Sequence, residues 1–187
     1  LLLLALILLG LSPKLVLAQE KSKAPAPKEF FGFQPGSEGN LFTYEQLISY
    51  LQTLDKDSPR LKMEQIGESP MGKPMYILFI SSEENITTIE NIREANLKRT
   101  GVLQGTPNSE IGIVWLSYNV HGNESSGTEA AMQTAYELIT EKQELLQNTL
   151  VILDPCVNPD GRDRYVNWYN QNHGLTPNID VNAEEHN

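Results

Sequence analysis

IGIVWLSYNV, residues 111–120, is a near-continuous apolar run that ends at a polar segment beginning HGNE. An apolar run of this length predicts a central strand that is buried on both faces. Residues 127–146 follow with the longest helical pattern in the chain, and TLVILDP, residues 149–155, is a second buried strand by the same criterion. The order strand, helix, strand predicts an α/β fold.

The residues before this unit predict two further helices. Thr43 and Gln46 have the spacing of a capping box, and apolar side chains then recur at helical spacing through residues 43–56. Residues 86–99 carry a weaker helical pattern among charged side chains. These helices are expected to flank the sheet.

Two short β-rich runs lie between the predicted helices. They are LKMEQIGES, residues 61–69, and KPMYILFISS, residues 73–82, and the Pro and Gly between them fit a tight turn. The turn predicts a β-hairpin, whose strands are antiparallel. Together with the strand, helix, strand unit, the hairpin predicts a mixed parallel and antiparallel central sheet.

The first eighteen residues, LLLLALILLGLSPKLVLA, resemble a secretory signal whose basic start is missing. The apolar run is shorter than the roughly 20 residues that span a bilayer. We therefore expect cleavage after Ala18 and export to the periplasm or the exterior without a membrane anchor. Residues 19–39, rich in Pro, Gly and charge, predict an extended lead-in to a domain over residues 40–187.

Composition restricts the partners and the chemistry. The chain has 187 residues, enough for one domain, and a net charge of −10, which argues against nucleic acid as a partner. Cys156 is the only cysteine, so no internal disulfide forms, and no base neighbours it in the sequence. We expect it to be a small buried side chain. No feature of the sequence indicates an oligomeric state.

His121 and Glu124 are the best candidates for metal ligands. They directly follow the predicted strand, and ligand sites in open α/β sheets collect at the carboxyl ends of strands. Imidazole and carboxylate both bind zinc, and Gly122 permits a sharp turn between them. A catalytic zinc needs three protein ligands and an open position, so a third ligand must come from elsewhere. A salt bridge at the strand end is the alternative interpretation.

Two motifs resemble those of the zinc carboxypeptidases of the carboxypeptidase A type, in particular secreted bacterial members. They are VWLSYNVHGNESSGTEAAM, residues 114–132, and VILDPCVNPDGRDR, residues 151–164. The likeness extends over about residues 40–187. It implies one zinc ion held by His121 and Glu124, and a structural turn at residues 158–161 near the substrate cleft.

The same resemblance implies that the chain holds only the front part of the catalytic domain. The third ligand, a histidine, and the general-base glutamate are expected beyond residue 187. His173 and His186 are accordingly not assigned as ligands, and Glu129 is expected on a helix face instead of acting as the base. The chain by itself is expected to be inactive.

Arg162 and Arg164 are the candidates for substrate binding. A guanidinium group binds a carboxylate with two hydrogen bonds, which suits the terminal carboxylate of a peptide. Surface pairing with Asp163 is the alternative. The polar residues from 157 onward predict a loop, and Asp154 and Asp160, before Pro and Gly, are expected to be turn residues that bond their own backbone.

The function implied by the resemblance is zinc-dependent hydrolysis of C-terminal peptide bonds in a peptide or protein substrate. Two alternatives stay open. One is a zinc amidase or deacylase on the same fold that acts on cell-wall peptides. The other is a secreted homologue that binds peptides without catalysis.

Overall fold

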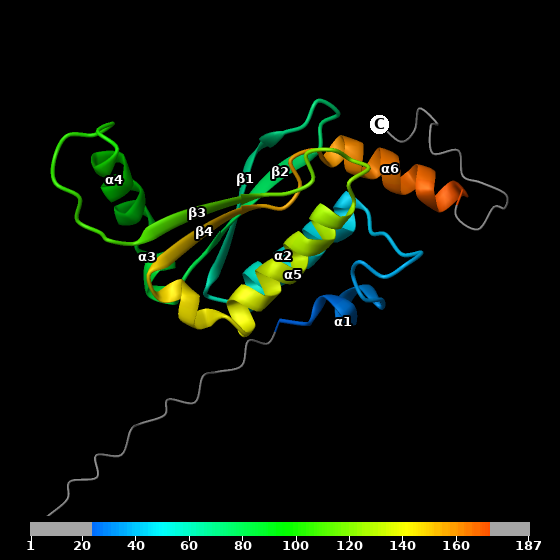
Figure 1. Cartoon of the computed structure of the whole chain (residues 1–187), viewed down its shortest axis with the longest axis horizontal. Coiled ribbons are helices and arrows are strands. Elements are labelled where there is room, and N and C mark those ends of the chain that lie inside the picture. The colour runs from blue at the N-terminus through cyan, green and yellow to red at the C-terminus, as the bar shows by residue number, and fades with distance from the viewer. Residues whose placement is uncertain (1–23, 173–187) are drawn as a thin grey trace, which may run out of the picture.

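A four-stranded sheet in the order β1-β2-β4-β3 carries the helices of the chain (Figure 1). The computed structural model describes residues 24–172, so the predicted signal, His173 and His186 lie outside the described residues. The elements are α1 (Pro27–Phe31), α2 (Tyr44–Asp57), β1 (Leu61–Glu68), β2 (Pro74–Ile80), α3 (Glu83–Thr87), α4 (Ile89–Arg99), β3 (Gly112–Ser117), α5 (Ser126–Thr140), the 3-10 helix η1 (Gln143–Gln147), β4 (Thr149–Asp154) and α6 (Pro159–Asn172).

The mixed sheet predicted from the sequence is confirmed. β1 and β2 form the antiparallel hairpin, β2 pairs antiparallel with β4, and β3 pairs parallel with β4. The hairpin turn closes through the Ser69 amide, which donates to Lys73 O at 2.8 Å, and through Gly72 at φ 79°. Gly72 takes this left-handed conformation at no steric cost.

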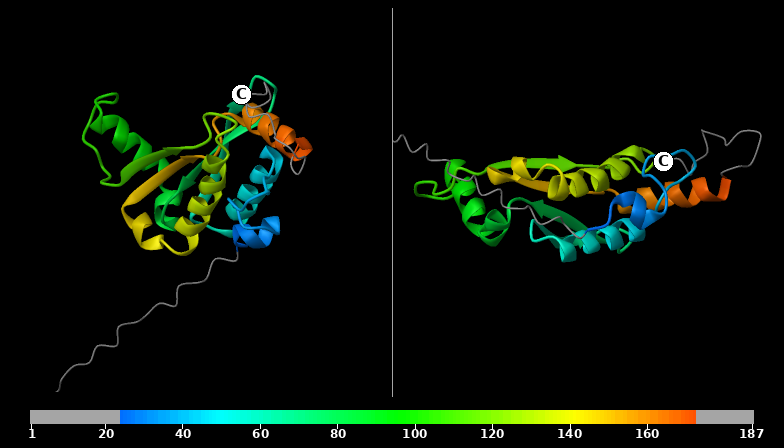
Figure 2. Two further views of the ribbon diagram at one scale, coloured as in Figure 1. Left: turned by 45° about the vertical axis from the view of Figure 1, so that its right-hand side comes forward. Right: turned by 90° about the horizontal axis from the view of Figure 1, so that it is seen from below.

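Helices α2 and α5 lie side by side on one face of the sheet (Figures 1 and 2). α2 begins with the predicted capping box: the Gln46 amide donates to Thr43 Oγ1 at 3.2 Å and the Thr43 amide to Gln46 Oε1 at 2.9 Å. Side chains from α2, α5, β2 and β4 form a single hydrophobic core, which includes Leu47, Leu51, Leu54, Leu78, Met132, Ala135, Ile139 and Leu153. Within residues 24–172, none of the helices is long and apolar enough to cross a bilayer.

The position of β3 corrects one expectation. β3 was predicted to be buried on both faces, but among the described residues it is an edge strand, with Val114 43% and Trp115 61% exposed. β4 occupies the interior position instead. Apolar composition predicts that a strand will be covered, and it does not say which neighbour covers it.

Two helical expectations also change. The helix predicted for residues 86–99 is divided into α3 and α4 at Thr88, whose φ of −114° and ψ of 22° interrupt the helix.

The loop predicted from residue 157 is wrong over α6. Asn158 caps α6, because the Gly161 amide donates to its Oδ1 at 2.9 Å, and Pro159 takes the first helical position. Val166 and Trp168 anchor the helix by burial.

The segment expected to be an extended lead-in is packed from Ala24, which is 7% exposed. α1 places the rings of Phe30 and Phe31 at 5.0 and 5.5 Å from that of Tyr50 on α2. The Tyr50 hydroxyl donates to Pro25 O at 3.0 Å. Residues 24–39 therefore belong to the packed structure.

Candidate functional site

Two loops meet at the carboxyl ends of the parallel strands β3 and β4. We call residues 118–125 the β3–α5 loop and residues 155–158 the β4–α6 loop. The Tyr118 amide donates to Asp154 O at 3.0 Å, the Val157 amide to Tyr118 O at 3.0 Å, and the Asn158 amide to Asn119 O at 3.2 Å. The strand pairing thus continues into both loops and holds them together.

His121 and Glu124 stand at the two ends of one β-turn. The Glu124 amide donates to His121 O at 3.1 Å, which brings the backbones of the two residues within one turn of each other. Both side chains are exposed. The structure therefore presents an imidazole and a carboxylate to solvent at the strand end, where the sequence predicted them.

Gly122, between them, is required for a reason other than the one predicted. It is buried, and its φ is not positive, so the turn needs no glycine conformation here. A Cβ atom at Gly122 would collide with the backbone of Gly161 at the start of α6. The absence of a side chain at Gly122 lets the β3–α5 loop and α6 approach backbone to backbone.

Asn119 organises the β3–α5 loop from inside. It is 5% exposed and has a φ of 56°, a left-handed conformation that Asn adopts more readily than most residues. Its Nδ2 donates to His121 O at 2.8 Å and to Glu124 O at 3.2 Å. Sequence reasoning missed Asn119, although an Asn between a strand and a turn is a recognisable signal for this conformation.

Cys156 and Asp154 support the β4–α6 loop. Cys156 is 2% exposed, as expected for a small buried side chain, and its Sγ donates to Asn119 Oδ1 at 3.2 Å. Burial raises the pKa of the Cys156 thiol to about 12, so the thiol is protonated at neutral pH. Asp154 accepts from the Cys156 amide at 3.3 Å, as predicted for a turn residue.

Asp160 was expected to accept a hydrogen bond from its own backbone turn, and instead it accepts hydrogen bonds from the β1–β2 hairpin turn. Its Oδ1 accepts from Ser69 Oγ at 2.8 Å and its Oδ2 from the Met71 amide at 3.1 Å. Both contacts lie in the β1–β2 hairpin turn. Asp160 therefore joins α6 to the hairpin.

Arg162 lies in the interior. Its side chain is fully buried, its Nη2 donates to Glu129 Oε1 at 2.9 Å and to Phe42 O at 2.8 Å, and its Nη1 donates to Ser125 O at 3.1 Å. Burial raises the pKa of the Glu129 carboxyl, and the hydrogen bond from Arg162 opposes that rise. A guanidinium with no exposed surface cannot clamp a substrate here, so the substrate role predicted for Arg162 gives way to a structural one.

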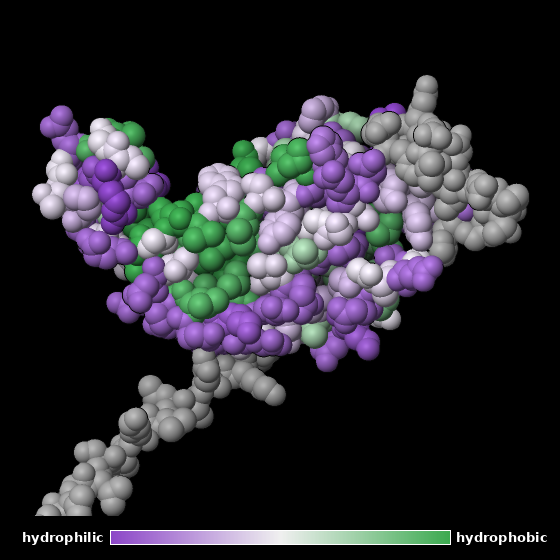
Figure 3. Space-filling model, in the orientation of Figure 1, coloured by the Kyte–Doolittle hydropathy of each residue, from purple (hydrophilic) through white to green (hydrophobic). Residues whose placement is uncertain are grey.

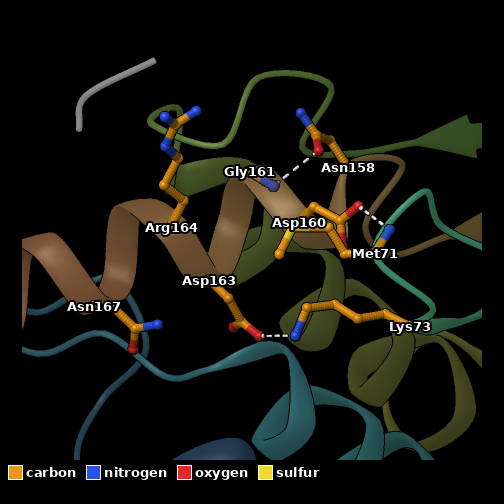
Figure 4. A pocket seen from close by; sticks show the side chains of 8 residues that line it. All are labelled: Met71, Lys73, Asn158, Asp160, Gly161, Asp163, Arg164 and Asn167. Atoms are coloured by element: carbon orange, nitrogen blue, oxygen red, sulfur yellow. Dashed lines mark hydrogen bonds and ion pairs between the residues drawn. The ribbon is translucent and has the colours of Figure 1, made fainter. Parts of the chain in front are cut away.

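Arg164 is exposed and lines a pocket of about 740 Å³ between α6 and the hairpin turn (Figure 4). Asn158, Asp160 and Lys73 also line this pocket. Asp163, the alternative partner considered for the two arginines, forms an ion pair with Lys73. In Figure 4 the Arg164 side chain points away from that ion pair.

The pocket adjoins the β3–α5 loop, because Asn158 Nδ2 donates to Val120 O at 3.2 Å. The donors on that loop are of the kind zinc prefers, one imidazole and one carboxylate. They are too few for a closed site, since no group of three His, Cys, Asp or Glu residues gathers within residues 24–172. The described residues therefore supply two donors of the kind that a zinc site uses.

We compared the chain with protein-family models, curated sequences and solved structures. A family model described as zinc carboxypeptidase matches residues 47–184. No curated protein sequence gives a significant match. Among solved structures, carboxypeptidase A from Helicoverpa armigera is 20% identical with a TM-score of 0.50, and the match covers 72% of this chain and 31% of that one.

Two further solved structures match at lower TM-scores. Bovine thrombin-activatable fibrinolysis inhibitor, in complex with tick carboxypeptidase inhibitor, is 16% identical with a TM-score of 0.49, over 68% of this chain and 34% of that one. A putative carboxypeptidase from Burkholderia mallei is 16% identical with a TM-score of 0.43, over 64% and 26%. The chain thus spans about a third or less of the length of these structures. Because the family model matches most of its length, the chain belongs to the zinc carboxypeptidase family.

Proposed function

We propose that the chain is part of a zinc-dependent carboxypeptidase that hydrolyses C-terminal peptide bonds, with His121 and Glu124 as two ligands of one zinc ion. The observation that carries this is their placement on one β-turn, both exposed, at the carboxyl ends of parallel strands. Family membership supports the choice of metal and reaction. When bound, zinc polarises the scissile carbonyl and lowers the pKa of a bound water.

The third zinc ligand and the general base are proposed to lie in a longer protein. A catalytic zinc needs a third protein ligand and a base, and residues 24–172 do not bring a third donor to the turn. The third ligand, a histidine, and the general-base glutamate are proposed beyond residue 187. In this proposal the 187-residue chain binds zinc weakly and does not hydrolyse peptides.

The substrate is a peptide with a free carboxylate, and Arg164 is the residue of this chain proposed to bind it. Arg164 is exposed, and the pocket that it lines adjoins the β3–α5 loop through Asn158. A guanidinium can bind a carboxylate with two parallel hydrogen bonds. Export through the predicted signal at residues 1–18 is part of the same proposal and would bring the enzyme to extracellular or periplasmic peptides.

Zinc binding by the 187-residue chain tests the metal site. Titration against a chromophoric chelator should give measurable affinity for wild type and at least tenfold weaker binding for His121→Ala and Glu124→Gln, because each removes a ligand. Glu141→Gln, at an exposed glutamate after α5, is the matched control and should bind as wild type does. Equal affinity in all four proteins would overturn the assignment.

Peptide binding tests the substrate class. Fluorescence anisotropy should show tighter binding of a peptide with a free C-terminus than of the same peptide with a C-terminal amide. The difference should disappear in Arg164→Met and persist in Arg93→Met, whose arginine is exposed on α4. Equal binding of both peptides by the wild type would contradict recognition of the terminal carboxylate, and would favour an amidase.

A further inference from the structure

One carboxamide spans the turn that carries the two proposed zinc ligands. Both N–H groups of Asn119 Nδ2 are used, one toward His121 O at 2.8 Å and one toward Glu124 O at 3.2 Å. The only backbone hydrogen bond within the turn runs from the Glu124 amide to the same His121 O. The side chain of Asn119 therefore fixes the distance between the two ends of the turn.

Asn119 is itself held from three directions. Its carbonyl oxygen accepts from the Asn158 amide at 3.2 Å, and its Oδ1 accepts from Cys156 Sγ at 3.2 Å. On the α5 side, a Cβ atom at Gly127 would lie 3.0 Å from the Asn119 amide nitrogen, so the two backbones are in close contact. Asn119 thus connects the exposed turn to the β4–α6 loop and to the start of α5.

We propose that Asn119 is the positioning residue that sets the His121 imidazole and the Glu124 carboxylate for a single metal ion. The inference rests on the proposed function. Zinc binds nitrogen and oxygen donors at about 2.0–2.2 Å, so small shifts between the ends of the turn remove one donor. Partners that orient metal ligands commonly contribute about 10–100-fold in metal affinity.

Two substitutions isolate the carboxamide. Asn119→Gly removes the side chain but still allows a φ of 56°, so backbone strain is not introduced. Asn119→Asp keeps the shape and replaces two N–H donors by a carboxylate that faces two carbonyl oxygens. Both variants should bind zinc about 10-fold or more weakly than wild type in the chelator titration.

Asn85 offers a matched control at the other end of the sheet. It is also a buried asparagine, and its Nδ2 donates to Leu146 O and Gln147 O, both at 3.2 Å. Asn85→Asp should lower the unfolding temperature as Asn119→Asp does, and should leave the zinc affinity unchanged. Titrations are made well below the unfolding temperature of each variant.

The outcomes separate the two proposals. Weaker zinc binding confined to the Asn119 variants supports the positioning role. Wild-type affinity in both Asn119 variants, or an equal loss in Asn85→Asp, overturns it and leaves the zinc site standing. Failure of wild type to bind zinc, or insensitivity to His121→Ala, overturns the proposed function and this inference with it.

Discussion

Arg162 shows how a single buried charge can organise distant parts of the chain. Its guanidinium meets Glu129 at 2.9 Å and lies 4.4 Å from the centre of the Phe42 ring. Removing one partner of a buried ion pair leaves the other charged and desolvated. The residue is therefore expected to matter for stability and to have no direct contact with substrate.

Arg162→Met is expected to lower the free energy of unfolding by about 3–5 kcal/mol, because it leaves Glu129 buried without its cation. Urea denaturation followed by circular dichroism measures this. Arg93→Met breaks an exposed pair with Glu90 on α4 and should leave the midpoint unchanged. Similar midpoints for the two variants would contradict a structural role for Arg162.

Cys156 predicts a pH dependence of stability. Burial raises the pKa of its thiol from 9.0 to about 12, so between these values the unfolded chain loses the proton while the folded chain keeps it. Stability therefore falls as pH rises through this window. Cys156→Ser should show a shallower decline between pH 9 and 12 in urea midpoints. If the urea midpoints of wild type and Cys156→Ser fell equally steeply with pH, the thiol would titrate alike in the folded and unfolded states.

At the scale of elements, the contact between the β3–α5 loop and α6 depends on the absence of a side chain. Gly122→Ala would drive a methyl group into the backbone of Gly161. Overpacking of this kind costs about 1–3 kcal/mol, and backbone atoms cannot yield as a side chain does. We expect a lower unfolding temperature and weaker zinc binding in the chelator titration.

Gly112→Ala is the control for that substitution. A Cβ atom at Gly112 would meet only Asn148 O, at 3.7 Å, which is ordinary van der Waals contact. Its unfolding temperature should match that of wild type. If Gly122→Ala were equally well tolerated, the two backbones would not be in close contact.

The two edges of the sheet differ in how they meet solvent. β1 carries Lys62, Glu64 and Glu68, whereas β3, with the sequence GIVWLS, has no charge and no proline. Figure 3 shows apolar surface over the β3 and β4 end of the sheet, between α4 and α5. Uncharged, apolar edge strands favour pairing with another strand.

The 187-residue chain is therefore expected to self-associate through β3. Trp115→Lys places a charge on that strand, where Trp115 is 61% exposed, and should reduce association in sedimentation velocity. Ile66→Lys makes the same kind of change on β1, where Ile66 is 52% exposed, and should leave association as it is. A monomeric wild type would contradict the expectation.

For the molecule as a whole, the sequence predicted those features that depend on neighbouring residues. The capping box at Thr43 and the turn before Lys73 are local signals, and both give the expected elements. α6 escaped prediction because its buried side chains are few and include Arg162 beside Val166 and Trp168. From sequence alone, a charged residue is expected to be exposed, because charged side chains are rarely buried unless they are paired.

The candidate site divides in the same way. His121 and Glu124 could be named because strand-end position and donor type are visible in the sequence. Arg162 could not be placed, since its burial depends on Glu129, 33 residues earlier, and on Phe42, 120 residues earlier. Local sequence patterns do not indicate contacts between residues so far apart in the chain, and only folding brings these residues together.

The same long separation has a consequence for the order of folding. A contact that closes 120 residues of chain forms late, because loop closure costs entropy before the contact is gained, whereas the β1–β2 hairpin closes within a few residues. Contacts absent from the transition state act on the unfolding rate. In stopped-flow measurements, Arg162→Met should increase the unfolding rate and leave the refolding rate nearly unchanged. The Arg162 side chain therefore sets the lifetime of the folded state.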